Sequence, residues 1–125
     1  MKVVKTEAAP AAIGPYNQAV ICDGFVFTSG QIPIDPATGA FVPGGIREQT
    51  HQVFRNLQAV LAAADTDLSK AVKVTVFLQD MGDFAVVNEI YGQYFPNGQY
   101  PARSAVQVAC LPKNALVEIE AVAAL

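Results

Sequence analysis

Apolar residues recur at intervals of three and four between residues 46 and 64. The positions are Ile46, Val53, Phe54, Leu57, Val60, Leu61 and Ala64. These residues fall on one side of a helix with about 3.6 residues per turn. The run Asp65-Thr66-Asp67 then breaks the pattern. The segment is therefore predicted to be an amphipathic helix that buries a single stripe.

Other segments show the alternation typical of strands. Residues 72–78 alternate valine or leucine with more polar side chains, which predicts a strand with one face inward. Short apolar runs at residues 18–22 and 25–29 flank Asp23-Gly24, and this dipeptide favours a tight hairpin turn with positive φ. Further strands are predicted at residues 3–5, 103–110 and 115–123.

A second helix is predicted after residue 80 or 83, because either aspartate can cap it. The side chains expected to line one side are Phe84, Val87, Tyr91 and Phe95, and Pro96-Asn97-Gly98 ends the helix. Proline and glycine mark residues 33–45 as a loop. The order of elements predicts an α+β fold with helices on one face of a mixed sheet. The last two strands are expected to form one hairpin.

Composition adds an expectation about assembly. The chain has 125 residues, which fits one domain over residues 1–125. It is 52% hydrophobic and 15% charged, with a mean hydropathy of +0.30. A monomer of this size rarely exposes large apolar patches. We therefore expect a homo-oligomer whose neighbouring subunits cover the free face of the sheet; the alternative is an unusually apolar monomer.

Charge and hydropathy exclude several classes of partner. The net charge is −3, the sequence pI is near 4.9, and no stretch gathers Lys or Arg into a basic stripe. Nucleic acid is therefore not an expected partner. The first twenty residues lack the apolar core of a signal peptide, and no apolar run is long enough to span a bilayer. A cytoplasmic protein without a membrane partner is predicted.

Metal and disulfide chemistry are not expected either. Cys22 and Cys110 lie far apart, and neither has a second Cys or His at the spacing of metal ligands. Both are interpreted as ordinary structural thiols. His51 is the only histidine, and a solvated or interface position on a helix is favoured over a role as catalytic base. No glycine fingerprint of a nucleotide site is present, so no nucleotide crevice is predicted.

The candidate chemistry lies near the C-terminus. Arg103 begins a predicted strand, and its guanidinium stays charged and can bind a carboxylate through two parallel hydrogen bonds. Glu118 and Glu120 share one face of the next predicted strand. The hypothesis is a site for a small anionic substrate. The alternative is that Arg103 forms a structural salt bridge with Glu118 or Glu120.

Four motifs carry a family resemblance. They are IGPYNQA at residues 13–19, FTSGQIP at 27–33, PARS at 101–104 and VEIE at 117–120. From about Thr6 to its end, the chain resembles the RidA (YjgF-like) family of enamine/imine deaminases. The resemblance implies a chorismate-mutase-like α+β fold, a homotrimer and three sites between subunits. It also implies cofactor-free hydrolysis of reactive 2-imino acids, formed from enamines such as 2-aminoacrylate, to 2-keto acids and ammonia.

The resemblance assigns expected roles to individual residues. Arg103 matches the arginine that binds the substrate carboxylate, and Glu118 matches the acid that positions or activates water. The residues that match the lining of the cleft are Tyr16, Ser29, Gly30 and Asn88. Many relatives have cysteine where this chain has Ala105, so no thiol nucleophile is expected there, although the backbone at that position is still expected to bind ligand.

Several alternatives stay open. Tyr16 can be a packed loop residue, Ser29-Gly30 a plain turn, and Asn88 the partner of a structural hydrogen bond. Glu120 rather than Glu118 can handle the water. The same fold can also serve as a non-catalytic module that binds or senses small keto acids or amino acids. Ribonuclease and chaperone-like roles are linked to relatives, and the acidic balance argues against RNA cleavage. The motifs do not determine the preferred imino acid.

Overall fold

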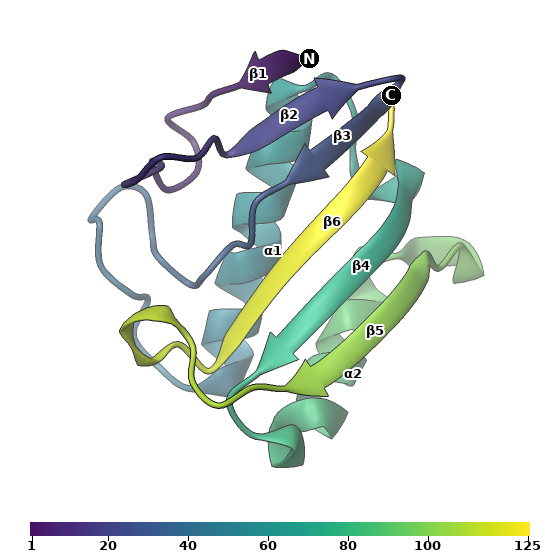
Figure 1. Ribbon diagram of the computed structural model, residues 1–125. Helices are drawn as coiled ribbons and strands as arrows, with labels where there is room; N and C mark the ends of the chain where they lie inside the picture. Colours follow the sequence, from purple (N-terminus) through teal and green to yellow (C-terminus); the bar gives the residue numbers. More distant parts are fainter.

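Six strands form one mixed sheet, and both α-helices pack on the same face of it (Figure 1). The computed structural model describes residues 1–125. The strands are β1 (Lys2–Val4), β2 (Ala19–Cys22), β3 (Phe25–Thr28), β4 (Ala71–Leu78), β5 (Ala102–Gln107) and β6 (Val117–Ala124), and the helices are α1 (Ile46–Ala63) and α2 (Phe84–Tyr94). The predicted α+β class is confirmed. None of the helices is both long and apolar enough to cross a membrane.

The hairpin of β2 and β3 forms where the sequence predicts it. The two strands pair antiparallel, with Cys22 opposite Phe25. Asp23 and Gly24 between them have φ values of 50° and 82°. Positive φ at both turn positions matches the right-handed twist of the flanking strands. Helix α1 and strand β4 also form within a residue or so of their predicted limits.

The predicted hairpin of the last two strands is wrong. The strand order is β1-β2-β3-β6-β4-β5, so β4 lies between β5 and β6 (Figure 1). Strand β5 pairs parallel with β4 after a crossover through α2, and β6 pairs antiparallel with β4 on its other side. The amide of Val108 donates to Leu78, and the amide of Gln79 donates to Leu116. The segment that joins β5 to β6 is therefore hydrogen-bonded at both of its ends to the C-terminal end of β4, and it crosses that end of the strand.

The core lies between the sheet and the helices. The fully buried apolar side chains of α1 are Val53, Phe54, Leu57, Val60 and Leu61, and all five belong to the apolar stripe that the sequence predicts. They pack in one cluster with Val74, Val76 and Ile119 of the sheet. The opposite face of the sheet has no helix over it, and Phe25 and Phe27 there keep about 40% of their surface exposed. That neighbouring copies of the chain cover this face remains a prediction.

A buried asparagine ties the long loop before α1 to that helix. Asn56 is 1% exposed, and its side-chain amide donates to the carbonyl oxygens of Ile32 and Ile34 at 3.1 and 2.9 Å. Its own carbonyl accepts from Gln52 at 2.9 Å. Backbone groups in a loop without a strand partner need such donors when they are buried. The residues that follow Gly30 are thus held in one place against the helix.

We expect Asn56→Ala to destabilise the protein by about 2–4 kcal/mol, because two carbonyl oxygens lose their donors in a buried place. Denaturant unfolding at fixed protein concentration measures the change. Gln58→Ala, at an exposed position of the same helix, is the matched control and should stay within about 0.5 kcal/mol of the parent. Equal effects of the two substitutions would contradict the assigned role of Asn56.

Candidate functional site

The guanidinium of Arg103 is held by side chains of α2. Its Nη1 donates to Oδ1 of Asn88 at 2.7 Å. The guanidinium carbon lies 4.7 Å from the ring centroid of Tyr91 and 5.3 Å from that of Phe84, which is within the range of cation–π attraction. Phe84, Asn88 and Tyr91 are spaced i, i+4 and i+7, so they lie on one face of α2. These contacts orient the cation while its remaining N–H donors stay free for a ligand.

The guanidinium group of Arg103 lines a cleft at the surface. The cleft has a volume of about 430 Å³ and is lined by Asn88, Tyr91, Gly92, Tyr100, Pro101 and Arg103. Arg103 itself is exposed. The only ion pair in the structure joins Arg47 and Glu89 at 3.6 Å. The alternative that Arg103 forms a structural salt bridge with Glu118 or Glu120 is therefore wrong within one chain.

Glu118 lies half-buried beside Gly30. A Cβ atom on Gly30 would lie 2.1 Å from Oε2 of Glu118, so only glycine lets the carboxylate occupy this place. Backbone hydrogen bonds in both directions between Gln31 and Ile119 keep the two segments side by side. Burial raises the pKa of Glu118, and the negative charge of Glu120 raises it further. A raised pKa makes this carboxylate a better proton acceptor than an exposed glutamate.

Arg103 and Glu118 point to opposite faces of the sheet. Arg103 pairs with Val74, which is buried on the side of the helices. Glu118 pairs with Phe77, and residues 74 and 77 of β4 point to opposite faces because side chains alternate along a strand. Val117 and Ile119 are fully buried on the side of the helices. Glu118 and Glu120 therefore share the open face, as the sequence predicts, away from Arg103.

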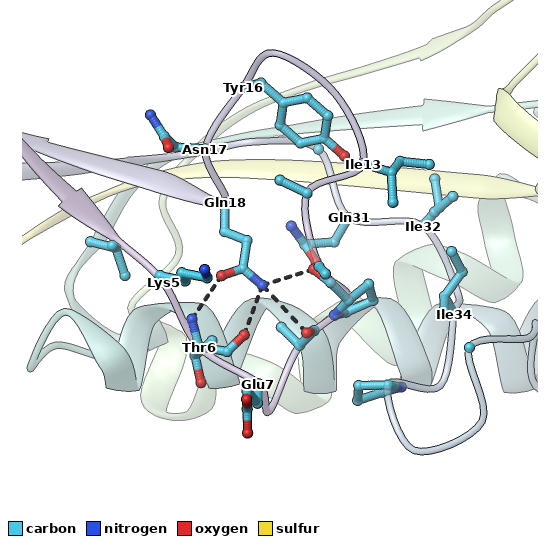
Figure 2. A pocket seen from close by; sticks show the side chains of 18 of the residues that line it. Lys5, Thr6, Glu7, Ile13, Tyr16, Asn17, Gln18, Gln31, Ile32 and Ile34 are labelled. Atoms are coloured by element: carbon cyan, nitrogen blue, oxygen red, sulfur yellow. Dashed lines mark hydrogen bonds between the residues drawn. The ribbon is translucent and has the colours of Figure 1, made fainter.

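A second, larger cleft is lined by two of the other candidate residues, Tyr16 and Gly30. It has a volume of about 700 Å³, and Tyr16, Asn17, Gly30 and Gln31 are among the residues that line it (Figure 2). Tyr16 is 50% exposed on a loop before β2. The hydroxyl of Ser29 donates to the carbonyl of Asn17, so it fixes this loop. The two clefts share no lining residue, and the candidate residues fall into two separate groups in one chain.

The remaining candidates have structural surroundings. Ala105 pairs with Val76 on the side of the helices and packs against the core. His51 is half-buried rather than solvated, and its Nδ1 lies 2.7 Å from the hydroxyl of Tyr94. Cys22 and Cys110 are both exposed, unpaired thiols. Neither these thiols nor His51 lines either cleft.

Comparison with known proteins decides the family. The family model described as Endoribonuclease L-PSP, of the YjgF/RidA family, matches residues 6–125. The chain belongs to the RidA family. A 2-iminobutanoate/2-iminopropanoate deaminase of Homo sapiens is 51% identical over 98% of this chain and 88% of its own length. A RutC family protein of Pyrococcus horikoshii is 53% identical over 98% of this chain and 96% of its own.

Solved structures of RidA-family proteins share the fold. A Rid-family protein of unknown function from Yersinia pestis has a TM-score of 0.97 at 48% identity, with 99% of this chain and 98% of that chain covered. The structure of E. coli TdcF with bound serine has a TM-score of 0.94 at 46% identity, with 100% and 99% covered. The extent of the family resemblance, from about Thr6 to the end, is confirmed.

Sequence reasoning missed how this RidA-family chain holds its arginine. The sequence predicted only that Phe84 and Tyr91 line one side of the second helix. It did not distinguish a catalytic role for Asn88 from a structural one. The structure shows that all three contact Arg103. The signal was present in the i, i+4, i+7 spacing of two aromatic residues and an amide. It could not be interpreted without knowing that β5 lies beside α2.

The raised pKa of Glu118 predicts a stability effect with a definite sign. The native state holds the proton more tightly than the unfolded chain, whose glutamate has a pKa of 4.5. Stability is therefore lost as the pH rises above that value through the native pKa. Glu118→Gln should remove this loss and raise the melting temperature near neutral pH by roughly 1–2 °C, a small change because solvent screens a half-exposed group.

Thermal unfolding between about pH 4 and pH 8 measures the effect. The difference between Glu118→Gln and the parent should vanish at the acid end, where both side chains are neutral. Glu7→Gln, at an exposed position, is the control and should show no comparable pH dependence. A Glu118→Gln variant that is less stable than the parent near neutral pH would contradict the assigned shift.

Proposed function

We propose that this protein hydrolyses 2-imino acids such as 2-iminobutanoate and 2-iminopropanoate to 2-keto acids and ammonia. The observation that carries the proposal is the pair of charged groups: an oriented, unpaired Arg103 and a half-buried Glu118 with a raised pKa. The 51% identity to a human protein named for this activity supports it. We expect the site to work without a metal or an organic cofactor.

Arg103 binds the carboxylate of the substrate in this proposal. One N–H of its guanidinium is engaged by Asn88, and the others can form the parallel pair of hydrogen bonds that a carboxylate accepts. Because Asn88 and the rings of Tyr91 and Phe84 already orient the cation, little side-chain freedom is lost when the substrate binds. Asn88 thus acts on the substrate through Arg103.

Glu118 is the proton acceptor for the attacking water in this proposal. The carbon of a protonated imine is already electrophilic, so attack by water requires orientation and a proton acceptor rather than a protein nucleophile. Glu118 takes a proton from the attacking water and returns it to the nitrogen of the resulting carbinolamine. The carbon–nitrogen bond then breaks as the hydroxyl proton passes to Glu118, and the products are a keto acid and ammonia, to which Glu118 finally gives up that proton. Tyr16 and backbone groups near Gly30 and Ala105 hold the iminium end of the substrate.

The site requires two copies of the chain, because Arg103 and Glu118 lie on opposite faces of one sheet. We propose a homotrimer, the assembly that the family resemblance implies. The exposed Phe25, Phe27 and Val106 on the sheet support an interface there. One protomer supplies the cleft with Arg103, and its neighbour supplies Tyr16, Gly30 and Glu118.

Substitutions at the charged groups test the proposal. We expect Arg103→Ala to lower kcat/KM for 2-iminopropanoate by roughly 10²–10³-fold, because charge-assisted hydrogen bonds to the carboxylate are lost. Arg103→Lys keeps the charge without the planar fork and should lose roughly tenfold. Glu118→Gln should lose roughly 10²–10⁴-fold. The measurement is hydrolysis of imine formed in situ by an amino acid oxidase, corrected for the spontaneous rate.

Glu120→Gln is the matched control for these variants, since Glu120 shares the open face with Glu118 but does not lie against Gly30. Its activity should stay within about tenfold of the parent. Hydrolysis by Arg103→Ala at the parental rate would contradict the assignment. A larger loss for Glu120→Gln than for Glu118→Gln would transfer the role of base to Glu120.

A second candidate function is the binding of small carboxylates without catalysis. E. coli TdcF, which shares this fold, is described with bound serine. An arginine-lined cleft serves binding as well as catalysis. Serine binding by calorimetry together with an imine hydrolysis rate no higher than the spontaneous one would favour this second candidate.

Electrostatics do not favour RNA as a substrate, although the family model carries the description of an endoribonuclease. The chain has a net charge of −3. Contacts with phosphates supply most of the affinity of proteins for nucleic acid, and they need clustered cations. The charge balance is better suited to a small substrate bound at one arginine.

A further inference from the structure

A buried glutamine supports the loop that carries Tyr16. Gln18 is 4% exposed and immediately precedes β2. Its Oε1 accepts from the amide of Thr6 at 2.8 Å. Its Nε2 donates to the carbonyl oxygens of Thr6, Ala9 and Pro10 at 3.0, 3.3 and 2.8 Å (Figure 2). One side chain thus satisfies four backbone groups of residues 6–10.

These bonds replace a strand partner that the loop does not have. Strand β1 ends at Val4 and β2 begins at Ala19, so residues 6–10 have no backbone ladder. Buried backbone groups need partners of some kind, and the amide of Gln18 provides them. The far end of the loop is fixed separately, because the Ser29 hydroxyl donates to Asn17 and the Ser29 amide donates to Gln18 at 2.9 Å.

The tip of the loop between these two attachments is exposed. Residues 11–17 are all exposed, and Ile13 and Tyr16 keep 78% and 50% of their surface accessible. No side-chain hydrogen bond is made by Tyr16. Its position in the lining of the larger cleft therefore depends on where the two ends of the loop are held.

We infer that Gln18 is a positioning residue, which sets the place of Tyr16 in the wall of the substrate cleft. The predicted effect on KM rests on the proposed function. The predicted effect on the position of the loop rests only on the hydrogen bonds of Gln18. A side-chain amide of this length meets the requirement, since its oxygen accepts from one N–H and its two N–H donors are shared among three carbonyl oxygens. Glutamate would place an oxygen, and leucine an apolar group, against those carbonyls.

The test compares Gln18→Glu with Gln58→Glu. Both substitutions exchange an amide for a carboxyl group of the same shape, and Gln58 is exposed on α1. Two readouts are measured: hydrogen exchange at the amide of Thr6, which donates to Gln18, and kcat and KM for 2-iminopropanoate. The affinity for serine is measured beside KM, so that a readout of the cleft exists even without turnover.

Near pH 8, Gln18→Glu should increase exchange at Thr6 and raise KM by roughly tenfold, with a smaller change in kcat, because Tyr16 loses its fixed place. Near pH 5.5 a larger fraction of the new carboxyl group is protonated than near pH 8, and the protonated form can again donate one hydrogen bond. The deficit relative to the parent should therefore shrink at the lower pH. Gln58→Glu should match the parent at both values.

Unchanged KM and serine affinity in Gln18→Glu, with exchange at Thr6 increased, would overturn the inference, because the loop would then move without consequence for the cleft. Unchanged exchange would overturn it as well. A parent that binds serine but does not hydrolyse the imine overturns the proposed function alone. Gln18→Asn keeps the amide but is one methylene shorter, so it should change exchange at Thr6 and KM in the same directions, and it replaces Gln18→Glu if that variant does not fold.

Discussion

Strand β4 separates the two strands that carry the charged candidate residues. Its neighbours are β5 with Arg103 on one side and β6 with Glu118 on the other. The register of the pairs sends one side chain toward the helices and the other to the open face. A single chain therefore cannot bring this cation and this carboxylate onto one small substrate. A cleft that uses both groups has to be completed by a second copy.

Each half of the candidate site is oriented in advance by its own chain. On one side, Asn88 and two aromatic rings fix the guanidinium of Arg103. On the other, the missing side chain of Gly30 admits the carboxylate of Glu118. Groups that are already oriented lose little entropy when a substrate binds, and they act on it in a fixed geometry. The proposed hydrolysis of an imine requires no protein nucleophile, because water attacks the electrophilic carbon.

Local patterns were sufficient to predict most of the elements. The period of α1, the alternation in β4 and the Asp23-Gly24 turn are properties of neighbouring residues, and the structure confirms them. The strand order was not predictable in this way. An adjacent pair of strands suggests a hairpin, and nothing local shows that β5 pairs with β4 instead. The error mattered because it placed Arg103 and the glutamates together.

The motifs were sufficient to nominate the candidate residues, but they did not predict the surroundings of those residues. Arg103, Glu118 and Gly30 lie in recognisable motifs, but the contact between Gly30 and Glu118 joins segments far apart in the chain. The rings beneath Arg103 come from a helix whose position depends on the crossover. The buried amide of Gln18 serves a loop that has no periodicity at all. Such contacts are set by tertiary structure, which local sequence patterns do not encode.

Co-assembly of two inactive variants tests most directly whether the site lies between copies of the chain. Arg103→Ala and Glu118→Gln subunits are mixed in equal amounts, unfolded and refolded together, and assayed for imine hydrolysis. With random assembly, about a quarter of the sites receive an intact Arg103 from one protomer and an intact Glu118 from its neighbour. The account predicts that the mixture regains about a quarter of the parental activity. Activity no higher than the sum of the two variants refolded separately would contradict it.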